Sequence, residues 1–546
     1  MAMIQVRKNH TLIRNPLDSC LGFGYLSFWL CISISLVWAS LVWAQPGQDI
    51  FLANAKALSL GHAVTADPPG IDSIHFNPAG LAKLRDLQFE FKGVYADVSL
   101  TGQFQSSPEY DRLLSIGNFH DQVSGSNSKI NGITIFLPKA GLVDLPAAAA
   151  GMGGISWESK KYGITFADAV YAPLAGGVNR DDDDPGRYSY RRVGVTRLTY
   201  FSPSFGVYLT DTLAVGASLG ASYFGVGDET DVRFPNTILG GFENVRRGLC
   251  GAFGLQVSVC AGSLDPTQPL ASIELAVQDP LSLTFNLGVL WEPTDWFSWG
   301  AAYQSGARDK LRGTLKLKYS EGTRKFLQDT VDSVTVNGRH PNINTKEQTL
   351  KTTIDFPYPQ HFSTGISVKV VPQWKFNMDL KWTETSVWDQ WTIRFDEPVD
   401  ILALAGPILS LLGAPGVSAN QVILPRGYQD AWNLSFGVEH QLNDQLVLRM
   451  GYEPRKSHIP DNKRDFIVPL GDVDIYGMGL GYRPTSDTDI DLALALIKSH
   501  QYIPSDTSDN ANSLNVNNFI YNPYAGQNIT TDLNVSLFLL SYRTRF

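Results

Sequence analysis

Apolar and polar residues alternate with a period of two along most of this chain. The clearest runs begin at Leu213, Leu281, Phe297, Phe376 and Ile490. This period predicts β-strands with one apolar face, because successive side chains of a strand point to opposite faces. After residue 44 there is no clean run of about twenty apolar residues. A membrane location would therefore require a closed barrel, since lipid offers an open sheet edge no hydrogen-bond partner.

The segment 296–319 carries an especially long alternating run. Its apolar face is expected to continue unbroken from Phe297 through Leu311 to Tyr319, with the basic residues of the segment on the opposite face. An uninterrupted run of this kind predicts a single long strand.

The connections between the expected strands alternate strictly between short and long. Six short turns and seven long loops join fourteen strands, and an even number brings both barrel ends to the same side. Short turns are expected near 159–161, 210–211, 292–295, 371–373, 442–445 and 484–488, and long loops near 103–146, 174–189, 228–280, 320–348, 397–427, 456–472 and 503–530. The strands are expected at 88–102, 147–158, 161–173, 190–209, 212–227, 281–291, 296–319, 349–371, 374–396, 428–441, 445–455, 473–483, 489–502 and 531–546.

A large soluble β-sandwich would also show alternation. Two features favour a barrel in the bacterial outer membrane. The short turns fit the periplasmic side and the long loops the outside of such barrels. Aromatic residues such as Tyr208, Trp291 and Tyr452 lie at expected strand ends, where membrane interfaces are rich in Trp and Tyr. The last strand is amphipathic and ends on Phe546.

The N-terminus has the features of an export signal. Positive charge precedes an apolar stretch from Leu21 to Val42, and Val42-Trp43-Ala44 offers small residues for cleavage before Gln45. A membrane anchor helix is the alternative, because the apolar stretch is long for a signal. We therefore expect a signal peptide at 1–44, followed by a separate N-terminal segment at 45–87 and the barrel at 88–546.

Charge and cysteine content narrow the function classes. Only 18% of residues are charged and the net charge is -9, so no basic stripe is available for a nucleic-acid partner. Cys250 and Cys260 are the two cysteines after the signal, and an exported pair this close is expected to form a disulfide. Two free thiols are the alternative. The acidic run 181–184 fits a solvated loop better than a metal site, and no metal or other cofactor is predicted.

The sequence carries no recognisable catalytic motif. Its nine histidines are scattered, and no Gly-x-Ser-x-Gly elbow or His-Glu-x-x-His helix occurs. No catalytic residue is predicted, although an outer-membrane lipase is not excluded by sequence alone.

Residues 45–87 do not alternate. They contain a short helical candidate at Ala57–Ala63, the turn Asp67-Pro68-Pro69-Gly70 and an Asn-Pro turn within His75–Ala82. Such a segment would hang in the periplasm or fold into the lumen, and a fourteen-stranded barrel is wide enough to hold it.

Here the chain resembles the FadL/TodX-type family of outer-membrane transporters of long-chain fatty acids and hydrocarbons. The resemblance is strongest over Ala57–Leu84 and continues at Gly93-Val94-Tyr95 and Gly427–Trp432. It implies an all-β fold, a 14-stranded antiparallel transmembrane β-barrel with a small N-terminal hatch in the lumen. The hatch would include Phe51, Asn77, Pro78, Ala79 and Gly80.

The resemblance also implies an outer capture site, a tighter inner pocket and a kink in the third strand that gives the ligand a lateral exit. The kink is expected at Gly163 or at the end of the strand, where the candidates are Pro173, Gly176 and Gly177.

An apolar stretch at 401–417 is unusual for an outer loop and indicates an interaction site. We expect it to line the entry groove, with packing inside an outer cap as the alternative. The candidate residues are Leu402, Leu404, Ile408, Leu411 and Leu412.

A fatty acid would need a cation for its carboxylate, and Arg426, Lys381 and Arg394 are the candidates, of which Lys381 and Arg394 are expected to point inward. Structural charges facing the lumen are the alternative for each of them. A neutral hydrocarbon would need no such cation, so the sequence leaves the substrate open.

The sequence thus predicts passive, ligand-gated uptake of hydrophobic compounds by a monomer. Its partners would be the ligand, outer-membrane lipid, lipopolysaccharide and the barrel-assembly machinery. An outer-membrane lipase or esterase and a general porin are the alternatives.

Overall fold

The structure of the protein is a computed structural model. It describes residues 52, 54–117, 119–145, 148–235, 248, 265–325, 328, 346–400, 402–403, 418–515 and 522–546. The expected signal peptide therefore lies outside the described residues.

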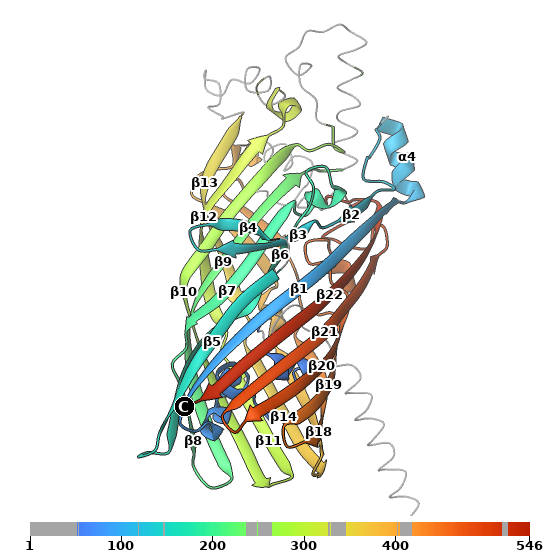
Figure 1. The fold of residues 1–546 in the computed structure, drawn as a ribbon. Coiled ribbons are helices and arrows are strands. Elements are labelled where there is room, and N and C mark those ends of the chain that lie inside the picture. Colours follow the sequence, from blue (N-terminus) through green and yellow to red (C-terminus); the bar gives the residue numbers. More distant parts are fainter. Residues whose placement is uncertain are drawn as a thin grey trace, which may run out of the picture. The chain divides into compact units, whose positions relative to one another are not determined.

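Fourteen antiparallel strands form a closed barrel (Figure 1). Five of them are interrupted once, so each of these consists of two labelled strands. The wall strands are β1 (Leu87–Ser106), β5 (Ala148–Ser159), β6 (Ile164–Asn179), β7 with β8 (Arg192–Phe201, Ser204–Tyr208), β9 (Leu213–Val232), β10 (Ala271–Thr294), β11 with β12 (Phe297–Gln304, Ala307–Tyr319), β13 with β14 (Glu347–Tyr358, His361–Val371), β15 with β16 (Trp374–Thr383, Gln390–Phe395), β17 with β18 (Gln421–Pro425, Ala431–Asn443), β19 (Leu446–Arg455), β20 (Asp472–Thr485), β21 (Thr488–Ile503) and β22 (Gln527–Arg545).

The first and last strands close the barrel. Strand β1 pairs with β22 from Gln88 opposite Arg545 to Ser106 opposite Gln527, and on its other edge it pairs with β5. The predicted fold class, strand number and rhythm of short turns and long loops are confirmed. No helix in the described part of the chain is long and apolar enough to cross a membrane.

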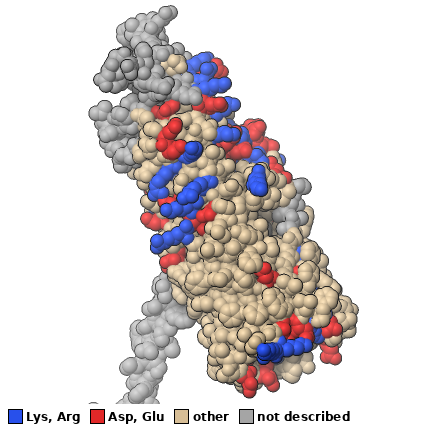
Figure 2. All heavy atoms as spheres, turned by 90° about the vertical axis from the view of Figure 1, so that its left-hand side faces the viewer, with Lys and Arg blue, Asp and Glu red and all other residues tan. Residues whose placement is uncertain are grey.

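Apolar side chains cover the outer face of the lower wall. On β10 the outward residues Leu281, Leu283, Phe285, Leu287 and Trp291 are all exposed. Figure 2 shows a band almost free of charged residues between the charged upper region and the charged lower rim. A belt of this kind faces the hydrocarbon layer of a membrane, which is about 25 Å tall in barrels of this class.

The wall is taller than expected and continues above this belt. Strand β10 begins at Ala271 rather than at 281, and its 24 residues span roughly 60 Å along the barrel at a tilt of about 40°. The loop expected at 228–280 is therefore shorter, because β9 continues to Val232.

At the top of the belt, several strands change which of their two faces carries the apolar residues. The expected unbroken apolar face of 296–319 is wrong: the strand is interrupted after Gln304, and Leu311 is fully buried against the inner-face residue Phe224. Strand β10 has an irregularity between Asp279 and Ser282 with the same effect. An extra residue in a strand reverses which side chains face inward. Apolar residues therefore face lipid below this level and the lumen above it.

The connection expected as a loop at 103–146 is structured. It contains α4 (Pro108–Gly117), β2 (Asn127–Lys129) and a hairpin of β3 (Gly132–Leu137) and β4 (Gly141–Leu145). The hairpin lies on the outer face of β7 and β9 (Figure 1). Glycines make this close packing possible, since a Cβ at Gly225 or Gly227 would collide with the ring of Phe136.

Candidate functional site

Residues 54–84 fill the lower lumen with four short helical turns. These are α2 (Ala55–Ser59), η1 (Gly70–Asp72), α3 (Ser73–Phe76) and η2 (Pro78–Lys83). Asn54 caps α2 by accepting the Ala57 N–H at 2.8 Å, and Asn77 caps η2, where Pro78 takes the first position. We call residues 54–84 the hatch.

The hatch is seated against a ring of inward-facing glycines. At each of them an added Cβ would lie closer than 3.0 Å to a hatch atom, so the wall approaches the hatch as closely as backbone allows. These glycines are Gly154, Gly206, Gly216, Gly288, Gly300, Gly437, Gly451, Gly477 and Gly479. We call them the glycine ring.

Asn77 connects the hatch to the wall. Its side chain is 0% exposed. Its amide nitrogen donates to the carbonyl of Thr65 at 2.7 Å and to the carbonyl of Val289 on β10 at 3.0 Å. Its amide oxygen accepts from the Ala79 N–H at 3.1 Å. One side chain thus joins two turns of the hatch and one wall strand.

Buried polar contacts also hold the hatch. Asp379 on β15 accepts the N–H groups of Val64 and Thr65 at 2.9 and 2.8 Å. Lys92 on β1 pairs with Asp72 at 2.5 Å. These contacts satisfy groups that would otherwise be buried without partners, which stabilises the seated hatch.

The surroundings of two titratable hatch residues shift their pKa values. Burial raises the pKa of Asp67, but the ammonium groups of Lys375 and Lys56 outweigh it and hold that pKa well below its usual range. Burial lowers the pKa of His62 despite its 2.8 Å contact with Glu453. The carboxylate of Asp67 is therefore ionised and the imidazole of His62 neutral at pH 7.

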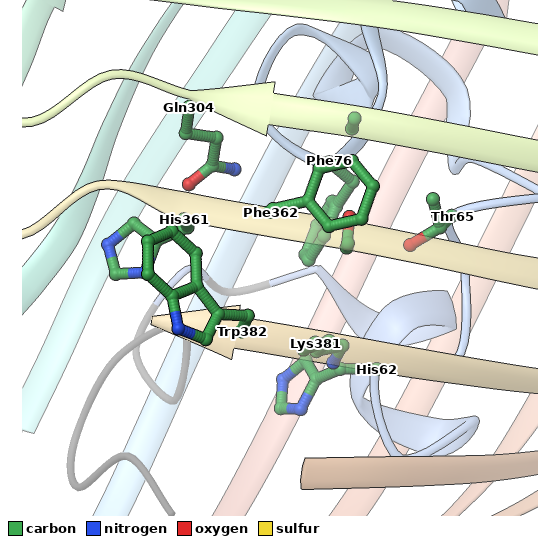
Figure 3. A pocket seen from close by; sticks show the side chains of 10 residues that line it. His62, Thr65, Phe76, Gln304, His361, Phe362, Lys381 and Trp382 are labelled. Carbon is green, nitrogen blue, oxygen red and sulfur yellow. The ribbon is translucent and has the colours of Figure 1, made fainter. Parts of the chain in front are cut away.

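A small pocket lies between the hatch and three wall strands (Figure 3). Its volume is about 30 Å³, enough for about one or two water molecules. The hatch contributes Phe76 and two polar residues, and β11, β14 and β15 contribute the rest. The lining residues are His62, Thr65, Phe76, Ala302, Gln304, His361, Phe362, Ser363, Lys381 and Trp382. This space is too small for a toluene or fatty acid molecule.

Above the hatch, buried apolar side chains pack together on the inner wall. A cluster near the outer rim contains Leu315, Leu350 and Val399, and a cluster below it contains Phe224 and Leu311. The two clusters share neighbours and the lower one reaches β6 and β7, where the hatch cluster begins. The linking residues are Leu275 and Ile393 between the first two clusters, and Leu174, Val195, Ala172, Ala175 and Leu198 on β6 and β7. We call these two clusters, together with the linking residues, the apolar track.

Among the described residues, one buried ion pair interrupts the apolar track. Arg197 on β7 donates to Asp309 at 2.6 Å and to Ser282 at 2.6 Å. Its guanidinium also lies over the ring of Tyr358, 4.1 Å from the centroid. Sequence reasoning missed this pair. The expected strand 190–209 contains Arg197 together with Arg191 and Arg192, and nothing in the sequence distinguishes the buried one.

The hydrogen-bonded wall is interrupted between β1 and β6. Strand β1 pairs with β5 up to Ala96 and with β2 from Thr101, and β6 pairs with β5 only up to Val170 and with β3 only from Val178. Within the described residues no strand pairs with the facing edges of 97–99 and 171–177. We call this region the wall interruption.

An irregularity of β6 lies at the wall interruption. Its register against β7 shifts between Tyr171 and Leu174, so that Pro173 belongs to a bulge. Gly177 lies just above, packed against the carbonyl of Thr134 on the outer hairpin. Gly163 lies instead in the turn that precedes β6 and has a positive φ of 64°.

The three predicted carboxylate partners lie in different places. Lys381 lines the small pocket. Arg426 is buried among the outer loops, where it pairs with Asp465 and lies over the Trp391 ring. Arg394 is half-exposed and pairs with Asp355, on the face of its strand opposite to Ile393, so the expectation that Arg394 points inward is wrong.

Of the predicted entry residues, Leu402 is described and packs against the outer-rim cluster of the apolar track. Leu404, Ile408, Leu411 and Leu412 lie outside the described residues, as do Phe51, Cys250 and Cys260. In the acidic run, Asp184 caps a turn by accepting the N–H of Gly186 at 2.7 Å.

A closed barrel with an apolar belt, a lumenal hatch and an apolar inner track defines a plugged outer-membrane barrel. The chain belongs to the outer membrane protein transport protein family (OMPP1/FadL/TodX), whose model matches residues 49–546. This confirms the predicted family and the outer-membrane location.

One curated relative is the long-chain fatty acid transport protein of Escherichia coli O6:H1 (strain CFT073). It is 23% identical over 327 residues, which is 52% of this chain and 66% of that protein. The match therefore spans slightly less than two thirds of the relative's length.

Solved structures share the fold. A Pseudomonas aeruginosa FadL homologue is 16% identical with a TM-score of 0.63, covering 92% of this chain and 100% of that chain. The Pseudomonas putida toluene transporter TodX is 14% identical with a TM-score of 0.56, covering 93% and 100%. The Ralstonia pickettii toluene transporter TbuX is 16% identical with a TM-score of 0.53, covering 91% and 99%.

Proposed function

We propose that this protein carries hydrophobic small molecules passively across the outer membrane. The observation that carries the proposal is the apolar track, which runs from the outer rim to the wall interruption. Apolar side chains above the belt gain nothing from lipid, because the wall there stands outside the hydrocarbon layer. An apolar ligand that enters between them would leave water and contact apolar side chains.

Capture would take place at the outer rim. Leu402 and the apolar residues packed around it offer the upper end of the apolar track. The remaining leucines of 401–417 are proposed to extend this surface. Relatives named as fatty acid and toluene transporters are consistent with ligands of this chemical class.

Exit would be lateral, through the wall interruption. The inner side of this region is apolar, with Val98, Ala172 and Ala175 packed in the hatch cluster. Strand edges without hydrogen-bond partners are unfavourable at a membrane. Their presence beside the end of the apolar track is therefore consistent with an exit for the ligand. Below this level the glycine ring leaves no clearance past the seated hatch.

The bulge at Pro173 offers a direct test. Deleting Pro173 removes the extra residue between Tyr171 and Leu174 and keeps Leu174 on the inner face, so β6 can pair regularly with β7. Pro173→Ala keeps the bulge and is the matched control. We expect the deletion to reduce uptake of radiolabelled toluene at least about tenfold, because it closes the exit path, while the control stays near wild type.

Uptake would be measured in a host strain that lacks its own long-chain fatty acid transporter. Heat-modifiable electrophoretic mobility checks that each barrel is folded. Normal uptake by the folded deletion variant would contradict lateral exit. Hydrolysis of a fatty acyl ester by purified protein would instead favour the outer-membrane lipase considered from the sequence, and free passage of ions would favour a porin.

A further inference from the structure

The buried charges of this protein bear on which hydrophobic molecules it accepts. Among the described residues, each buried Lys or Arg lies within salt-bridge distance of a carboxylate. These six cations are Lys92, Arg180, Arg197, Arg233, Arg426 and Arg455. Each of the six cations therefore already has a carboxylate partner, with which a bound anion would have to compete.

Arg197 matters most, because it is the cation on the apolar track. Asp309 and Ser282 take one N–H donor of each terminal guanidinium nitrogen, both at 2.6 Å. The ring of Tyr358 lies against the guanidinium plane. The side chains of Arg197 and Asp309 are 1% and 2% exposed. The pair is thus a neutral unit enclosed by apolar residues.

Lys381 is the other cation that a ligand would meet, at the pocket beside the hatch. Its ammonium lies 3.4 Å from Glu453, and it also interacts with the carboxyl group of Asp379. Glu453 is shared with Arg455 at 3.0 Å. Two cations face two carboxyl groups here, so this pocket is also close to neutral.

A ligand carboxylate would therefore add an uncompensated charge to a region of low dielectric constant. Such a charge is strongly disfavoured unless it is paired. A neutral ligand avoids this cost and still gains the burial of its apolar surface. We infer that the transported ligands are uncharged hydrophobic molecules, such as hydrocarbons and long-chain alcohols, and that Asp309 selects against anions by neutralising Arg197. This inference rests on the proposed transport function.

A matched pair of ligands tests it. Radiolabelled dodecanol and laurate share a chain length, and at about pH 8 laurate is ionised, since a carboxyl group has an ordinary pKa of about 4. Binding would be measured to the purified protein in nanodiscs, with empty nanodiscs subtracted. Wild type should bind dodecanol at least about tenfold more tightly than laurate.

The variants separate charge from shape. Asp309→Asn leaves the charge of Arg197 uncompensated, so laurate affinity should rise about tenfold or more while dodecanol affinity changes less than about twofold. The double variant Arg197→Met/Asp309→Leu removes both charges. It should keep dodecanol binding and gain no laurate binding. It also controls for an unfolded Asp309→Asn variant, because burial of an apolar pair in place of an ion pair is tolerated.

The outcomes are distinguishable. Equal binding of laurate and dodecanol by wild type would overturn the inference, and so would a folded Asp309→Asn variant without any gain for laurate. Preferential dodecanol binding with the expected gain supports it. Failure of wild type to bind either ligand would contradict the transport proposal itself.

Discussion

Asn77 is the residue whose loss should act most directly on the hatch. Asn77→Ala would leave the carbonyls of Thr65 and Val289 and the N–H of Ala79 without their partner in a fully buried place. Each unsatisfied group costs about 1–3 kcal/mol. We expect a loosened hatch inside an intact barrel, seen as more frequent channel openings in planar bilayers. The exposed Asn534 provides the control, since Asn534→Ala should leave the openings unchanged.

His62 should make the hatch sensitive to acid. Burial depresses its pKa below the ordinary 6.5, so a released hatch binds this proton more readily than a seated one. Seating is therefore strongest above pH 6.5 and weakens as the pH falls below that value. Glu453, Lys381 and Arg455 are the charged groups that act on it.

The check is channel opening as a function of pH. Openings should increase between about pH 6.5 and 5 in wild type. His62→Asn removes the titrating group, and Asn tolerates the positive φ of this position, 58°. A pH profile of this variant identical to that of wild type would exclude His62 as the cause.

Sequence reasoning reached some site residues and not others. Non-alternation marked residues 45–87 as different from the strands, and the resemblance to the transporter family then indicated Asn77 as a hatch residue. Arg197 was not found, because an arginine within an expected strand is indistinguishable from one that faces solvent until its partner Asp309, far away in sequence, is known. Arg394 was placed on the wrong face for the same reason.

Among the structural elements, the glycine ring yields a sharp test. A Cβ at Gly451 would collide with the backbone of Leu60 and Gly61, and overpacking of this kind costs about 1–3 kcal/mol. Gly451→Ala should therefore displace the hatch and raise channel opening. A Cβ at Gly93 would meet nothing within 4 Å, so Gly93→Ala is the control. If the folded Gly451→Ala variant shows no increase in channel opening, the prediction is wrong, and the hatch still closes the lumen after a small shift.

The strands were predictable because alternation against lipid is a local property. Their upper ends were not, because the irregularities near Asp279 and after Gln304 reverse the faces without any distinctive residue type. The hairpin at 132–145 was also missed. Its strands pair mainly with each other and lie outside the barrel wall, a placement that depends on glycines of distant strands.

At the scale of the whole molecule, the hatch and the wall should be separable. Strand β1 begins at Leu87, after the hatch, and pairs along its full length with β22. Removal of residues 54–84 is expected to leave a folded barrel with a steady and much larger ion conductance, because a lumen of fourteen strands is too wide for its own side chains to fill. Single-channel recording beside the intact protein checks this. An equally silent deletion variant would mean that another segment blocks the lumen.

The glycine ring carries a consequence for the living cell. At seven of these nine positions, all except Gly154 and Gly479, the nearest atoms that an added methyl group would meet belong to the hatch, so we expect selection there to act on leakage more than on folding. A bacterium carrying such a substitution would make normal amounts of barrel and still lose part of its protection against large antibiotics. Drug sensitivity, more than protein abundance, would then reveal which inner glycines are indispensable.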